Sequence, residues 1–220
     1  IVGYVGPREV VPLLMDGLKR LEYRGYDSAG VAVVEDHALV RERAEGKLDR
    51  LSEKLAGQPS LWKRGRYGVA HTRWATHGKP VEKNAHPVVD SQHRIAVIHN
   101  GIIENFLPIK RRLIAEGWTF STDTDTEVIA NLVSSYLDGD LAAAVRRAVA
   151  ELEGMYACAL VSADSAEEEI VAVRQGTPLV LGIGAGEQFL ASDPAALLQH
   201  TKDVVFLDNG DVARLVKDGI

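Results

Sequence analysis

The sequence is organised around residues 71–78, which read His-Thr-Arg-Trp-Ala-Thr-His-Gly. A short apolar run precedes them, so we expect a buried strand that delivers a cluster of polar side chains to a surface loop. Arg73 offers a planar fork of donors that suits a carboxylate. Thr76 and His77 offer hydrogen-bonding groups of shorter reach, and Trp74 offers a large rigid face. The stretch is predicted to form a binding site, and it contains no obvious nucleophile.

A second candidate is the dipeptide Asn100-Gly101, which lies between Ile98 and Ile102. Asn-Gly between apolar residues is the strongest short signal for a two-residue hairpin turn, and on these residues alone the turn is the favoured interpretation. The alternative is functional. The Asn100 amide and the Gly101 N–H would then be two donors aimed at one oxygen.

The composition is that of an ordinary globular chain. The sequence has 220 residues, of which 46% are hydrophobic and 25% charged, with a formal net charge of −6. One core of this size suits a single domain over residues 1–220. The densest basic run is residues 110–112, far less than nucleic-acid binding needs, so we expect no nucleic-acid partner.

We expect neither a membrane partner nor a bound metal or other cofactor. No apolar run reaches the ~18 residues of a membrane span. The seven histidines lack the spacing of a metal site, and no cysteine accompanies them. The single cysteine, Cys158, lies in an apolar strand and is predicted to be a small core residue. With no possible internal disulfide, a cytoplasmic location is the default expectation.

The predicted elements come in blocks rather than in strict alternation of strand and helix, which favours antiparallel sheets covered by helices in an α+β fold. Strands are predicted at 1–6, 31–34, 39–43, 67–72, 95–98, 155–162, 170–174, 179–183 and 188–191, and as a final hairpin of 204–207 with 212–216. Helices are predicted at 9–21, 47–55, 105–116, 126–137 and 141–152, with a short one at 194–199.

Two further segments leave alternatives open. Residues 22–30 place two aromatics and Arg24 between turn residues, which is typical of a tight turn, although Arg24 is a rigid choice for a plain turn. Residues 124–127, Thr-Asp-Thr-Glu, have the spacing of a capping box at the start of a helix. Asp123 or Asp125 is explained equally well as a negative charge at a helix N-terminus.

Taken together, residues 21–30, 71–78, 99–105 and 124–127 resemble the glutaminase domains of the glucosamine-6-phosphate synthase family, which belongs to the class II glutamine amidotransferases. The resemblance runs from Ile1 to about Val216. It implies a four-layer αββα sandwich of two antiparallel sheets flanked by helices, the N-terminal nucleophile hydrolase type. It also implies one glutaminase domain over residues 1–220, with the C-terminal sugar isomerase domains absent from this sequence.

The resemblance implies a substrate-binding role for one group of residues. Arg73 resembles the residue that holds the α-carboxylate of L-glutamine, and Asp125 resembles the one that holds its α-ammonium. The physical argument agrees, because a cation and an anion on opposite sides of a pocket can pair with the α-carboxylate and the α-ammonium of a free amino acid. Trp74 resembles an aromatic gate over the ammonia exit. The other implied members of the pocket are Thr76, His77 and His86.

A second group is implied to serve catalysis. Asn100 and Gly101 resemble the oxyanion hole, and Arg24 and Gly25 resemble the segment that packs beside the nucleophile. Family members begin Cys-Gly-Ile-Val-Gly, whereas this sequence begins Ile-Val-Gly. The nucleophilic cysteine would therefore precede Ile1, and a chain that begins at Ile1 is predicted to be inactive.

The implied activity is glutamine amidohydrolysis through a glutamyl thioester on a terminal cysteine. The ammonia would serve the conversion of fructose-6-phosphate to glucosamine-6-phosphate, so the expected partners are L-glutamine and C-terminal isomerase domains. One alternative is a glutamine- or glutamate-binding module without catalysis. Another is the glutaminase domain of a different class II amidotransferase, although the motifs at 23–27 and 74–77 favour the glucosamine-6-phosphate synthase family, which makes hexosamines.

Overall fold

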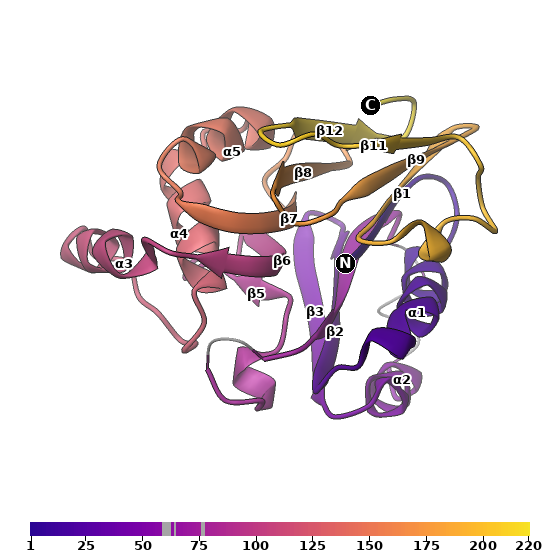
Figure 1. The fold of residues 1–220 in the computed structure, drawn as a ribbon, viewed down its shortest axis with the longest axis horizontal. Helices are drawn as coiled ribbons and strands as arrows, with labels where there is room; N and C mark the ends of the chain where they lie inside the picture. The colour runs from indigo at the N-terminus through magenta and orange to yellow at the C-terminus, as the bar shows by residue number, and fades with distance from the viewer. Residues whose placement is uncertain (59–62, 64, 76–77) are drawn as a thin grey trace.

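A computed structural model describes residues 1–58, 63, 65–75 and 78–220. The predicted site residues Thr76 and His77 lie outside the described residues. Two antiparallel sheets are stacked face to face, and helices cover the outer face of each sheet (Figure 1). The predicted α+β fold of four layers is therefore confirmed. In the part of the chain that the structure describes, no helix has both the length and the apolar character needed to cross a membrane.

The larger sheet has seven strands in the order β11-β9-β10-β1-β4-β2-β3. Their bounds are Val2–Val5 (β1), Ser28–Glu35 (β2), Ala38–Glu45 (β3), Tyr67–Arg73 (β4), Val180–Gly184 (β9), Glu187–Ala191 (β10) and Val204–Phe206 (β11). The first strand lies in the middle of this sheet, antiparallel to β10 on one side and to β4 on the other.

The smaller sheet has five strands in the order β12-β8-β7-β6-β5. Their bounds are Val88–Val89 (β5), Ile95–Ile103 (β6), Gly154–Ser162 (β7), Glu169–Gln175 (β8) and Val212–Val216 (β12). Alternate residues of both sheets meet in one buried apolar layer, for example Val69 of β4 with Ile98 of β6 and Ala159 of β7. This layer is the core between the sheets.

Each sheet has its own helical cover. Helices α1 (Val10–Leu21) and α2 (Leu48–Ala56) pack on the seven-stranded sheet. Helices α3 (Phe106–Ala115), α4 (Thr126–Tyr136) and α5 (Leu141–Val149) pack on the five-stranded sheet. Three short 3-10 turns complete the described elements: η1 (Glu22–Arg24), η2 (Glu82–Asn84) and η3 (Pro194–Ala196). Pro12 lies in the first turn of α1, where no intrahelical hydrogen bond needs its missing N–H.

The hairpin interpretation of Asn100-Gly101 is wrong. Strand β6 runs straight through the dipeptide, with Asn100 opposite Ala157 and Gly101 opposite Tyr156 of β7. Gly101 has φ +110°, and a Cβ there would lie 2.1 Å from the carbonyl oxygen of Met155. The glycine therefore permits a close approach of two strands rather than a turn.

The final predicted hairpin is also wrong. Strand β11 pairs with β9 in the larger sheet, whereas β12 pairs with β8 in the smaller one. Residues 208–211 do make a turn, in which the Asp211 backbone nitrogen donates to the Asp208 carbonyl. That turn carries the chain from one sheet to the other.

The capping box predicted at residues 124–127 does not form. The Glu127 carboxylate instead accepts hydrogen bonds from the backbone nitrogens of Ser121 (2.7 Å) and Thr122 (2.6 Å). Asp125 occupies the N-cap position of α4 without a side-chain cap bond. Its Oδ2 accepts from the backbone nitrogen of Ile103 at 2.9 Å. Asp125 is thus more than a helix charge, because it ties α4 to the end of β6.

Candidate active site

The site residues lie together because alternate residues of a strand point to the same face of its sheet. On β4, Tyr67 and Val69 fill the core between the sheets, so His71 and Arg73 continue the same face. On β6, Asn100 continues the face of Ile98 in the same way. The two strands belong to different sheets. Their polar ends therefore meet where the core between the sheets opens into a cavity.

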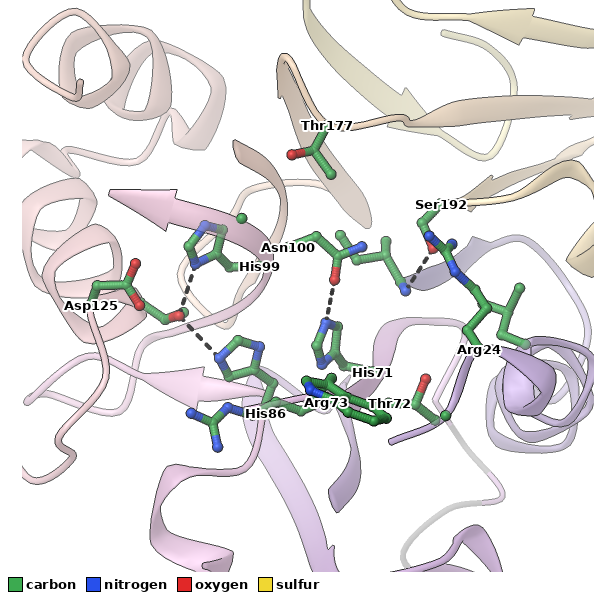
Figure 2. A pocket seen from close by; sticks show the side chains of 16 residues that line it. Arg24, His71, Thr72, Arg73, His86, His99, Asn100, Asp125, Thr177 and Ser192 are labelled. Atoms are coloured by element: carbon green, nitrogen blue, oxygen red, sulfur yellow. Dashed lines mark hydrogen bonds between the residues drawn. The ribbon is translucent and has the colours of Figure 1, made fainter. Parts of the chain in front are cut away.

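The cavity has a volume of about 310 Å³. Eight of the predicted site residues line it, drawn from η1, β4, β6, the segment before β5 and the start of α4 (Figure 2). They are Arg24, Gly25, Arg73, Trp74, His86, Asn100, Gly101 and Asp125. The structure thus brings together every predicted site residue that it describes, and their individual roles remain predictions.

A cation and an anion share this cavity. Arg73 and Asp125 both line it, and both side chains are buried. Burial lowers the pKa of the Arg73 guanidinium, and the carboxylates of Asp27 and Asp125 oppose that shift. Buried charges of opposite sign favour a ligand that itself carries one charge of each sign.

The segment that carries Arg73 and Trp74 is anchored by Asp27. Asp27 Oδ2 accepts a hydrogen bond of 2.6 Å from the backbone nitrogen of Ala75, and the Asp27 nitrogen donates to the Arg73 carbonyl at 2.8 Å. Trp74 is 69% exposed at the mouth of the cavity. Its ring lies against Gly25, which has φ +74° and where a Cβ would come within 2.6 Å of Trp74 Cζ3. The glycine is therefore required both by the backbone and by the indole.

Three buried histidines line the cavity wall. His71 Nε2 lies 2.8 Å from Asn100 Oδ1. Thr126 Oγ1 lies 3.0 Å from His86 Nε2 and 2.9 Å from His99 Nδ1, so one hydroxyl joins two imidazoles (Figure 2). Burial holds the pKa of His71 and of His86 well below its ordinary value. Both rings are neutral near pH 7 and serve as fixed hydrogen-bonding groups rather than as charges.

The amino end of β1 opens into the same cavity. Ile1 lines it, the Ile1 nitrogen donates to Ser192 Oγ at 3.1 Å, and the Ser192 nitrogen donates to the Ile1 carbonyl at 3.1 Å. The Ser192 side chain stands beside Arg24 in Figure 2. Ile1 and Asn100 therefore line one cavity.

Cys158 has no part in the cavity. It lies on β7 with its side chain among the residues packed under α3, α4 and α5, which confirms the prediction of a core residue. Burial raises the pKa of its thiol, so it is held in the unreactive protonated form. Among the described residues, no group of three His, Cys, Asp or Glu side chains is arranged to hold a metal ion.

Sequence reasoning missed several lining residues. His71 carried a signal, because it precedes Arg73 by two positions on the same strand and must share its face. His99 and Thr126 adjoin predicted site residues. Thr177 and Ser192 come from loops after β8 and β10, and no local pattern marks them.

Comparison with known proteins gives consistent matches. A family model described as a glutamine amidotransferase domain matches residues 41–219. The chain is 51% identical over 220 residues to the glutamine–fructose-6-phosphate aminotransferase (isomerizing) of Symbiobacterium thermophilum. It is 52% identical over 223 residues to the protein of the same name from Pseudomonas aeruginosa. Both matches cover 100% of this chain and 36% of the relative, so the chain spans little more than a third of those proteins.

Solved structures share the fold. The glutamine phosphoribosylpyrophosphate amidotransferase from B. subtilis, complexed with ADP and GMP, superposes with a TM-score of 0.76 at 21% identity. That match covers 99% of this chain and 49% of the other. The structure of an allosteric regulatory enzyme of purine biosynthesis gives a TM-score of 0.77, also at 21% identity, over 99% of this chain and 48% of that one. At this identity the likeness concerns the fold alone.

Proposed function

The chain belongs to the family of glutamine amidotransferase domains, and we propose on that premise that it binds L-glutamine and hydrolyses its side-chain amide. In this proposal residues 1–220 form one glutaminase domain. The observation that carries it is the shared cavity of Arg73, Asp125 and Asn100 at the amino end of β1. Those groups supply what the reaction needs: recognition of both α-carbon charges and a donor for the amide oxygen.

Binding is proposed to use the two buried charges. Arg73 receives the α-carboxylate through its planar fork of donors, and Asp125 receives the α-ammonium. His86 contributes hydrogen bonding to the cavity wall. The predicted contributions of Thr76 and His77 belong to the same proposal. Trp74, exposed at the mouth, covers the bound amino acid and the ammonia exit.

The nucleophile is proposed to be a cysteine two positions before Ile1. Ile1 and Val5 both belong to the core between the sheets, so every second residue of this strand faces that side. A strand continued by Cys-Gly would place the cysteine on the face of Ile1, toward the cavity. Arg24 and Gly25 would then pack beside it.

The proposed chemistry proceeds in two steps. The cysteine thiol gives its proton to its own α-amine, whose unperturbed pKa of ~7.7–8.0 suits a base near neutral pH. Sulfur attacks the amide carbon, the charge on oxygen is met by the Asn100 amide and the Gly101 N–H, and the C–N bond breaks as the amine returns its proton to the departing ammonia. Water then cleaves the thioester, releasing glutamate and restoring the thiol.

The whole-protein reaction is proposed from the relatives. The name of these relatives gives fructose-6-phosphate as the amino acceptor, and this chain spans 36% of the length of the Symbiobacterium relative. Ammonia released here would pass to C-terminal sugar isomerase domains, which would form glucosamine-6-phosphate. Identity of about half to these relatives, against 21% to the phosphoribosylpyrophosphate enzyme, favours the hexosamine family over other class II amidotransferases. A cytoplasmic location stays a prediction from the single cysteine.

The decisive experiment is a glutaminase assay on this chain with Cys-Gly placed before Ile1. We expect glutamate and ammonia in equal amounts, and none from a matched form with Ser-Gly. Absence of glutamate release from the cysteine form would overturn the proposal.

A second candidate is a glutamine- or glutamate-binding module without catalysis. The intact cavity favours it, since Arg73 and Asp125 are in place without any further residue. Calorimetry with glutamate on the chain that begins at Ile1 tests this candidate. If the form with Cys-Gly before Ile1 binds glutamine without hydrolysing it, the binding module is supported. If the chain that begins at Ile1 releases no heat of binding at millimolar glutamate, the binding module is contradicted.

A further inference from the structure

We propose that His71 is a positioning residue that holds the Asn100 side chain with its amide NH₂ turned into the cavity. The inference rests on the proposed function, in which that NH₂ donates to the oxygen of the glutamine amide. It adds a residue outside the predicted oxyanion pair.

An asparagine side chain has an acceptor end and a donor end, and only the donor end serves a developing oxyanion. Asn100 Oδ1 lies 2.8 Å from His71 Nε2. In Figure 2 the oxygen of Asn100 faces His71, and its nitrogen turns away from it. Among the described residues, His71 is the one hydrogen-bond partner of this side chain. The contact therefore selects which end of the amide faces the cavity.

The tautomer of His71 follows from its surroundings. The ring is buried, and burial holds its pKa well below the ordinary value, so it carries a single N–H. Nδ1 is buried without a hydrogen-bond partner in the described part of the chain. Because an amide oxygen only accepts, the proton must lie on Nε2 for the 2.8 Å contact to be a hydrogen bond. A buried imidazole whose N–H faced no partner would be less stable by about 1 to 3 kcal/mol.

The donor is held by rigid structure. His71 lies on β4, an interior strand of the seven-stranded sheet, opposite Gly30 of β2. Its ring packs against the ring of His86, with centroids 4.6 Å apart. His86 is held in turn by Thr126. The amide is therefore oriented before substrate arrives, and no reorganisation is needed as charge develops.

Loss of His71 should act on the transition state more than on binding. Without the imidazole, the amide is free to present its oxygen to the cavity, where it would repel the developing negative charge. The bound amino acid is held by Arg73 and Asp125, which His71 does not touch through any hydrogen bond that the structure gives. A fall in kcat with little change in KM is the expected pattern.

The tautomer is tested on the chain that begins at Ile1, by long-range ¹H–¹⁵N NMR of its histidines. We expect His71 to be the Nε2–H form, without titration between pH 5.5 and 8. A proton on Nδ1, or titration near pH 6.5, would overturn the inference. This arm needs no catalysis, so it is independent of the proposed function.

The kinetic arm uses the chain with Cys-Gly before Ile1. His71→Leu removes the donor at similar volume, whereas His71→Gln keeps an amide nitrogen near the place of Nε2. Because removal of a whole oxyanion donor costs ~100- to 1,000-fold, we expect kcat of the Leu variant to fall about 10- to 100-fold, and the Gln variant to recover about tenfold. His37→Asn, at an exposed turn residue with φ +59°, is the matched control and should keep full activity.

The outcomes separate the two proposals. An inactive parent would overturn the proposed function and the positioning role together. An active parent whose Leu variant keeps its kcat, while Asn100→Ala loses activity, would overturn the positioning role alone. Glutamate binding by calorimetry checks that each variant is folded. Should the Leu variant fail to fold, His71→Asn, whose amide is too short to reach Asn100, takes its place and should show the same loss of kcat.

Discussion

Asp125 Oδ2 accepts a 2.9 Å hydrogen bond from the backbone nitrogen of Ile103, and this bond joins the N-terminus of α4 to the last residue of β6. The same carboxylate lines the cavity. Asp125 therefore makes a structural contact and also places a carboxylate at the cavity wall, and substitution can separate the two.

Asp125→Asn should weaken amino-acid binding while keeping the fold. The amide oxygen of Asn still accepts from Ile103, but the charge that pairs with an α-ammonium is lost. Because hydrogen bonds to charged groups contribute about 1.5 to 3 kcal/mol, glutamate affinity by calorimetry should fall about 10- to 100-fold. The control is Asp123→Asn, which removes an exposed carboxylate paired with Lys83 at 2.8 Å. Equal affinity loss in both variants would contradict a specific role for Asp125.

Gly101→Ala should be far more destabilising than Gly117→Ala. Both glycines have positive φ, +110° and +96°, but a Cβ at Gly101 would meet the Met155 carbonyl at 2.1 Å, whereas at Gly117 nothing lies within 4 Å. Backbone strain alone costs about 1 to 2 kcal/mol, and overpacking adds about 1 to 3 kcal/mol. Urea unfolding of both variants measures the difference. An equal loss of unfolding free energy in the two variants would mean that β6 and β7 can move apart at Gly101 without cost.

Acid should destabilise the fold through the buried histidines. The folded-state pKa of His86 lies well below its unfolded value of ~6.5. The stability that its neutral buried ring contributes is therefore fully present above pH ~6.5, and it is lost as the pH falls toward the folded-state pKa. Between these two pKa values, each such histidine lowers the free energy of unfolding by about 1.4 kcal/mol for every pH unit of acidification. His86→Gln should flatten the pH dependence by that amount in urea titrations from pH 7.5 to 5. The exposed His37→Asn variant should keep the parent slope.

Cys158 should resist alkylation in the folded protein. It is buried, and burial raises the pKa of its thiol. Mass spectrometry after iodoacetamide should show no adduct on the native chain and one adduct in urea. In the form with Cys-Gly before Ile1, one adduct is expected when native and two when unfolded. Rapid native labelling at Cys158 would contradict its place in the core.

Local sequence signals predicted the elements well and their pairing less well. The strand at Tyr67 and the helix at Val10–Leu21 follow from apolar periodicity, which the structure obeys. Asn100-Gly101 carries the local signal of a turn, but nine consecutive pairings of β6 with β7 outweigh it. Strands β11 and β12 are adjacent in sequence and yet belong to different sheets, because β11 pairs with β9 and β12 pairs with β8.

The candidate site was predicted where its residues lie in compact motifs. Arg73 and Trp74 stand together in the sequence, and Asp125 lies in a short motif of its own, so a resemblance was enough to name them. Ser192 reaches the cavity because β10 pairs with β1, and Thr177 reaches it because the loop after β8 belongs to the facing sheet. No spacing along the chain contains that information.

The central place of β1 also bears on how the protein is made. Val2 is opposite Ala70 on one side and opposite Ala191 on the other, so β1 acquires its second neighbour only after this sequence has been synthesised as far as β10 (Glu187–Ala191). Until then one edge of an apolar strand stays uncovered and open to wrong pairing. During synthesis, the uncovered edge of β1 is therefore the place where wrong strand pairing is expected first.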